Sequence, residues 1–158
     1  MFIALSIFTL SSCGPDAREK AAVAYTTEMQ ALFVENKFIT SEFLDVATGL
    51  KKKELLAHDV AERFKSRILP RAVRLASEVD AIQPSSEALE QIHGGIERAW
   101  SLRADTYTKA AAAWAGNDLD GFARAQADNV AVSLAEERYI KAVNTILAEY
   151  QLSLDPYP

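Results

Sequence analysis

Cysteine and histidine are scarce in this sequence of 158 residues, which contains one cysteine and two histidines. A lone cysteine cannot close a disulfide within the chain, and it excludes the zinc and redox motifs that need paired cysteines. His58 and His93 leave few groups for acid and base chemistry near neutral pH. A Ser-His-Asp set, a phosphate-binding loop and a metal-ligand cluster are also missing. We therefore expect no catalysis and no cofactor.

Excess positive charge is absent as well, because the formal net charge is −5. Nucleic-acid binding depends on a basic surface that displaces counterions, so we expect no nucleic-acid partner. The apolar fraction of 49% and the charged fraction of 25% are typical of a globular protein that builds one core. A chain of this length favours a single domain.

The amino terminus carries an apolar segment, Phe2 to Leu10, that is too short for a membrane-spanning helix of about 20 residues. Its length suits the h-region of a signal peptide. The next residues complete the motif Leu10-Ser11-Ser12-Cys13, which resembles the lipobox of bacterial lipoproteins at all four positions. This resemblance implies that residues 1–12 are a signal peptide, cleaved before Cys13, and that the Cys13 thiol carries a diacylglyceryl group. The new amino terminus is often acylated too in that family.

The resemblance also implies a location in the cell envelope. One acyl chain anchors a protein only marginally, whereas two or more hold it stably, so an acylated Cys13 would keep the protein on membrane lipid. Gly14 rather than Asp follows the cysteine, which is similar to sorting toward the outer membrane, on its periplasmic side. The segment departs from the family pattern because residues 1–12 contain no Lys or Arg, and an upstream start would explain this. The alternative is that the apolar terminus packs on the domain and Cys13 is an ordinary small residue.

From residue 16 onward, apolar residues recur at alternating spacings of three and four, which predicts four helices of about 30 residues each. The first should end near Gly49 in a left-handed C′ position, and Pro70 should kink the second or divide it. A serine just before Glu87 should cap the third helix, and either Asn117 or Asp118 should cap the fourth. Short connections make neighbouring helices antiparallel, so the prediction is an all-α, up-down-up-down four-helix bundle. A division at Pro70 would instead give a three-helix or open hairpin arrangement.

The predicted domain organisation follows from these elements. Residues 1–12 form the signal peptide, residues 13–15 a lipidated linker, residues 16–152 the bundle and residues 153–158 a C-terminal tail.

Polar residues interrupt three of the predicted helical seams, at Asn36, Arg103 and Asn129. Their heights along an up-down bundle place them in one layer, with Asp59 or Glu62 of the second helix nearby. Buried polar groups must satisfy one another. Such a layer fixes the register of the helices, or alternatively lines a ligand pocket.

Other candidates carry weaker indications. Glu90-x-x-His93 has the spacing of a di-iron motif but lacks a second copy, and Met29 is poorly placed to share a haem with His93. We therefore expect His93 to lie at the surface and no metal to bind. An aromatic line of Trp100, Tyr107 and Trp114 is typical of a core, although an exposed line would stack on sugar rings.

Four arginines follow one stripe of the second helix, at Arg63, Arg67, Arg71 and Arg74. Pairing with the acidic neighbouring helices is one interpretation. A contact with anionic lipid headgroups or an acidic partner is the other.

Together these observations predict a membrane-anchored lipoprotein that acts as a non-catalytic binding or interaction module of the cell envelope. Its partner would be another envelope protein or the cell wall. The alternative is a bundle that binds a small ligand, a metal or haem, through the polar layer or the His93 region.

Overall fold

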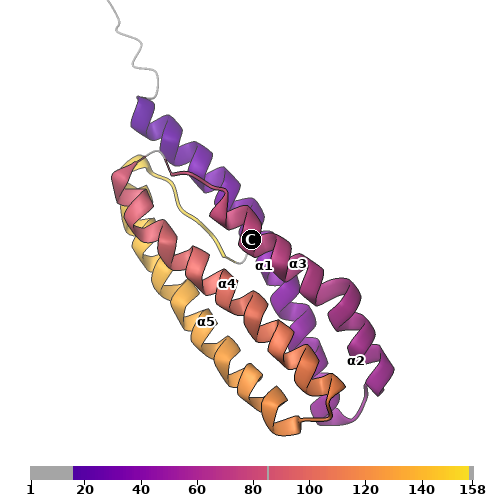
Figure 1. The fold of residues 1–158 in the computed structure, drawn as a ribbon. Helices are drawn as coiled ribbons and strands as arrows, with labels where there is room; N and C mark the ends of the chain where they lie inside the picture. Colours follow the sequence, from indigo (N-terminus) through magenta and orange to yellow (C-terminus); the bar gives the residue numbers. More distant parts are fainter. Residues whose placement is uncertain (1–15, 85, 157–158) are drawn as a thin grey trace, which may run out of the picture.

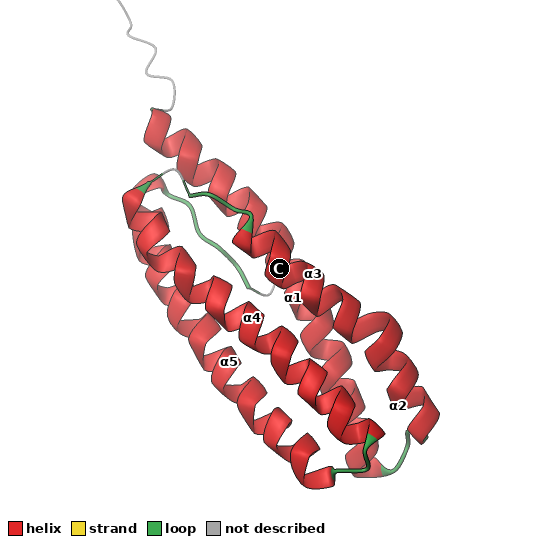
Figure 2. Ribbon diagram, viewed as in Figure 1, coloured by secondary structure: helices red, strands yellow, loops and turns green. Residues whose placement is uncertain are grey.

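Four antiparallel helical rods make up the computed structural model, which describes residues 16–84 and 86–156 (Figure 1). No strand occurs within these residues (Figure 2). The elements are α1 (Ala17–Lys52), α2 (Ala57–Arg63), η1 (Phe64–Ile68), α3 (Leu69–Asp80), α4 (Glu87–Ala115), α5 (Leu119–Leu147) and η2 (Ala148–Tyr150). The predicted all-α up-down bundle is confirmed. The lipobox and its Cys13 lie outside the described residues.

Side-chain caps start three of the four rods. The Asp16 carboxylate accepts a hydrogen bond from the Glu19 backbone N–H at 2.8 Å, and the Ser86 hydroxyl accepts one from Leu89 at 3.2 Å. Asp118 caps α5 in the same way, as predicted. Each cap satisfies a backbone donor that the first helical turn leaves free.

The end of α1 differs from the prediction. The helix runs through Gly49 to Lys52, and Lys53 takes the left-handed conformation with φ of 60°. Gly49 is needed instead for close packing, because a Cβ atom there would lie 2.6 Å from Leu55 Cγ. The glycine therefore lets the α1–α2 loop fold back onto the helix.

Alanine at Gly49 is expected to lower the free energy of unfolding by about 1–2 kcal/mol, since the clash with Leu55 outweighs the gain in helix propensity. Gly95, in the middle of α4, is the matched control, because nothing lies within 4 Å of a Cβ atom built there. Gly95→Ala should raise stability by about 0.5–1 kcal/mol. Urea denaturation of both variants measures the two values, and equal signs would contradict this account of Gly49.

Pro70 is accommodated by a wide helical turn rather than a break. Residues 64–68 form the π-helical turn η1, at whose end the Leu69 N–H bonds to the Phe64 carbonyl, five residues back. Such a turn re-pairs the backbone near a proline that lacks a donor. The elements α2, η1 and α3 therefore form one continuous rod, and the predicted three-helix alternative is wrong.

The rods pack in a ring that is tight on three sides. The second rod lies between α1 and α4, and α4 packs along α5, whereas α1 and α5 approach each other much less closely. Most predicted seam residues are buried, although Leu56 is 64% exposed. Among the described helices, none has the length and apolar character that crossing a membrane requires. The fold thus leaves one open seam, between its first and last helices.

Aromatic rings fill the core near the α4–α5 turn. Phe43 stacks on Tyr107 with ring centroids 4.4 Å apart, and Phe64 and Phe122 meet edge to face. Tyr107 and Trp100 are fully buried, so these two members of the aromatic line belong to the core, as predicted.

Candidate functional site

A buried polar cluster forms in the middle of the bundle around Arg103, which is 1% exposed. Its guanidinium donates to Asn36 Oδ1 at 2.5 Å and to Asn129 Oδ1 at 3.4 Å. The predicted layer of three polar residues is therefore confirmed, with the arginine from α4 bridging α1 and α5.

The counter-charge for Arg103 is Glu136 of α5, which sequence reasoning missed. Arg103 binds both carboxylate oxygens of Glu136, with 3.0 Å between Nη2 and Oε2. Oε1 also accepts from Asn36 at 2.9 Å and from the Trp100 indole at 2.5 Å. A carboxylate with these four hydrogen bonds is well compensated for its burial.

The predicted neighbours of this layer, Asp59 and Glu62, take no part in the cluster. Asp59 accepts from the Leu56 backbone N–H and pairs with His58, at the start of the second rod. Glu62 is exposed. Sequence offered one indication of the correct partner, because Glu136 follows Asn129 by seven residues and so shares its helix face.

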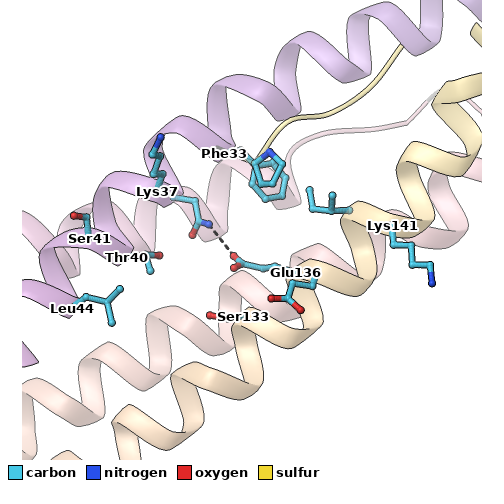
Figure 3. Close-up of a pocket in the computed structure, with 12 residues that line it drawn as sticks. Phe33, Lys37, Thr40, Ser41, Leu44, Ser133, Glu136 and Lys141 are labelled. Carbon is cyan, nitrogen blue, oxygen red and sulfur yellow. Dashed lines mark hydrogen bonds between the residues drawn. The ribbon is translucent and has the colours of Figure 1, made fainter. Parts of the chain in front are cut away.

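A cavity of about 440 Å³ lies in the open seam beside this cluster. Its apolar walls come from Phe33 and Leu44 of α1 and Ile140 of α5. Figure 3 shows Leu44 extending into the seam from α1 and the Glu136 side chain reaching toward α1 from α5. The surface of the cavity is thus mostly apolar, with polar groups where it meets the cluster and with Lys37, Glu137 and Lys141 among its other lining residues.

The chain after α5 turns back and closes one end of this seam (Figure 1). Leu154 is 1% exposed and belongs to the core. Pro156, two residues further on, lines the cavity itself. The tail therefore occupies the part of the α1–α5 seam that lies next to the cavity. We refer to the seam occupied by the tail, together with the cavity, as the α1–α5 groove.

His93 lies in the core, so the expectation that it sits at the surface is wrong. The side chain is 2% exposed, and Tyr25 OH lies 2.8 Å from Nδ1. Nε2 lies 3.0 Å from the Val79 carbonyl, which can only accept, so Nε2 carries the proton. Tyr25 OH also lies 2.6 Å from Tyr139 OH, so Nδ1 and the two tyrosine hydroxyls form one buried chain of hydrogen bonds.

Burial of this chain of hydrogen bonds raises the pKa values of its two tyrosines. Both ring nitrogens of its histidine have hydrogen-bond partners. Desolvation raises the pKa of Tyr25 to about 12, and desolvation raises the pKa of Tyr139 as well. Both ring nitrogens of His93 are engaged, which leaves neither for a metal or haem iron. Nowhere within residues 16–84 and 86–156 do three or more His, Cys, Asp or Glu side chains gather as a metal site.

The arginine stripe of the second rod pairs with glutamates of α1. Arg71 and Arg74 lie 3.1 and 3.0 Å from Glu35, and Arg67 lies 3.1 Å from Glu42. Arg71 also stacks over the Phe38 ring at 3.9 Å. The predicted pairing with an acidic neighbour is therefore confirmed, and these arginines hold α1 against the second rod.

The α1–α5 groove remains as the candidate functional site. It combines a sizeable cavity with the paired charges of Arg103 and Glu136, an arrangement suited to binding. Comparisons of the chain with known protein families, with curated proteins and with solved structures found no match. The interpretation of the α1–α5 groove therefore depends on its geometry in this chain.

Proposed function

We propose that this protein is a membrane-anchored bacterial lipoprotein whose bundle acts as a non-catalytic binding module of the cell envelope. The observation that carries the proposal is the open α1–α5 seam with its cavity of about 440 Å³. A bundle that served only as a spacer would gain stability by closing this seam as tightly as the other three. The lipobox resemblance at Cys13 supports the anchor.

Binding is favoured over chemistry by the hydrogen bonding of the largely buried carboxylate at the groove. Glu136 lies at the cavity, and its oxygens accept hydrogen bonds from Asn36, Trp100 and Arg103. These donors occupy both carboxylate oxygens. A general base must instead reach a substrate proton directly or through one water.

The position of the groove favours a protein or cell-wall partner over the anchoring lipid. The cavity starts at Phe33, 16 residues after Ala17 begins α1, which corresponds to about 24 Å at 1.5 Å per residue. Cys13 lies four residues before Ala17 in the sequence. When the bundle stands on its anchor, the groove therefore lies beyond the lipid headgroups.

The anchor is tested by Cys13→Ser. Serine lacks the thiolate that is alkylated during lipidation, so the variant should keep its uncleaved segment, lose the acyl chains and change its mobility on electrophoresis. Fractionation of cells together with the mass of the purified protein measures this. A variant that stays membrane-bound with the mobility of the wild type would contradict lipidation.

The groove is tested by a matched pair of surface substitutions. Leu44 lines the cavity and is 52% exposed, whereas Val73 on α3 is 56% exposed and lies away from it. Arginine at either position should change stability by no more than about 0.5 kcal/mol. In native gels of solubilised envelopes, Leu44→Arg should reduce the partner complex at least tenfold and Val73→Arg should leave it intact. Equal behaviour of the two variants would refute the groove as the binding site.

A small apolar ligand is the second candidate, because the cavity volume falls within the usual range of ligand pockets, about 300–1,000 Å³. A stoichiometric small molecule in the organic extract of purified protein would favour this function. An as-purified absorption spectrum tests haem, for which the engaged nitrogens of His93 predict no Soret band.

A further inference from the structure

We propose that the α1–α5 groove is a binding site for an extended peptide, and that the C-terminal tail occupies it in place of a partner segment. This inference rests on the proposed binding function and names the chemistry of the partner. The partner would present an extended segment with a buried aliphatic side chain where the tail presents Leu154.

Two side-chain amides, one from each wall of the seam, hold the tail through its backbone. Asn144 of α5 donates to the Leu154 carbonyl at 3.0 Å and accepts from the Leu154 N–H at 2.7 Å. Gln30 of α1 donates to the Asp155 carbonyl at 2.5 Å and accepts from the Asp155 N–H at 3.0 Å. Each amide thus pairs with both polar groups of one residue, as a neighbouring strand would.

These contacts recognise the backbone of the tail and a single side chain, that of Leu154. Leu154 is buried, whereas the residues on either side, Ser153 and Asp155, are exposed. Backbone hydrogen bonds supply affinity for extended segments in general, and a pocket for one side chain supplies selectivity. The site would therefore accept other segments that carry an aliphatic residue at this position.

The groove continues past the end of the described tail. Pro156 lines the cavity, whose remaining walls include Phe33, Leu44 and Ile140. A partner segment that follows the path of the tail would reach this cavity with its next residues. The space would take an apolar side chain and bury more surface than the tail does in the part that the structure describes.

Because the tail belongs to the same chain, a partner segment can bind the groove only by displacing it. A segment joined to its site by a short linker has an effective concentration in the millimolar range. A free peptide of similar affinity must compete with it. Partner binding would then displace the tail and expose the Leu154 side chain, so the tail acts as a built-in competitor.

The test uses a blocked synthetic peptide of residues 151–156 and the full-length protein. Leu154→Asp should release the tail, because its carboxylate would lose solvation in the buried position. Ser153→Asp is the matched control, since residue 153 is already exposed. Isothermal titration should show the peptide binding Leu154→Asp at least tenfold more tightly than wild type or Ser153→Asp. Adding Asn144→Ala to Leu154→Asp should weaken binding at least tenfold.

A folded Leu154→Asp protein, judged by circular dichroism, that binds the peptide no better than wild type would overturn the inference. Hydrogen exchange on wild type gives an independent reading. The Leu154 and Asp155 amides should exchange at least tenfold faster than that of Val143 in α5, because the tail opens without the bundle. Equal rates would also overturn it. If the peptide fails but Leu44→Arg still disrupts the partner complex, the proposed function stands and only the partner's chemistry is wrong.

Discussion

Replacing Glu136 by Leu is expected to lower the free energy of unfolding by about 3–5 kcal/mol. The substitution leaves the Arg103 guanidinium, 1% exposed, without its counter-charge in the centre of the bundle. It also removes the acceptor for Trp100 Nε1. Urea denaturation followed by circular dichroism measures the loss.

Two further variants separate this charge effect from general damage to α5. Glu137→Leu changes the exposed neighbour of Glu136 and should alter stability by no more than about 0.5 kcal/mol. Removing both charges in Arg103→Met with Glu136→Leu should cost less than Glu136→Leu alone, because no unpaired charge remains buried. A double variant less stable than the single one would contradict this account of the cluster.

Alkaline pH should unfold the protein between about pH 10 and pH 12. Burial raises the pKa of Tyr25 to about 12 and raises the pKa of Tyr139 and Tyr107 in the folded state. Their stabilising effect is fully present below pH 10, the ordinary tyrosine pKa, and is lost as the pH rises through the folded values. Each tyrosine contributes a slope of about 1.4 kcal/mol per pH unit, so three give about 4 kcal/mol per unit.

Tyrosinate absorbance and circular dichroism, recorded together, test this prediction. The buried tyrosines should ionise only as helicity is lost, in one cooperative step. Tyr139→Phe removes one of the three groups and should reduce the slope of stability against pH by about a third. Full ionisation of all the tyrosines near pH 10 with helicity retained would show that they are not buried as described.

The bundle and its polar layer were predictable because both depend on helical periodicity. Asn36, Arg103 and Asn129 interrupt apolar seams, so their burial followed from the position of those seams. Glu136 was missed although it shares a helix face with Asn129, and only its long side chain brings a carboxylate to Arg103. The partner of a buried charge depends on side-chain reach, which spacing alone does not specify.

His93 was predicted to lie at the surface because it is polar, although its spacing from buried residues of the same helix indicated burial. It falls four residues after Leu89 and three before Ile96, which are both buried. Its hydrogen bond to Tyr25 joins residues 68 apart in the sequence. The helical spacing therefore indicated that His93 is buried. It could not identify Tyr25, the hydrogen-bond partner that compensates for this burial.

The tail was the least predictable part of the site. A segment after the last helix carries no periodicity, and its seat depends on Gln30, which is 125 residues away from Asp155. Pro70 was predicted to kink or divide the second helix, and the spacing gave no indication of the π-helical turn that the backbone forms before it.

Photo-crosslinking in cells tests the central claim, that the α1–α5 groove is where this protein binds its partner. A benzophenone amino acid is placed at Ser41, which lines the cavity, and separately at Ser101, an exposed position of α4 outside it. We expect a discrete adduct of higher mass from Ser41 and none from Ser101. An equal adduct from Ser101, or only uncrosslinked protein from Ser41, would contradict it.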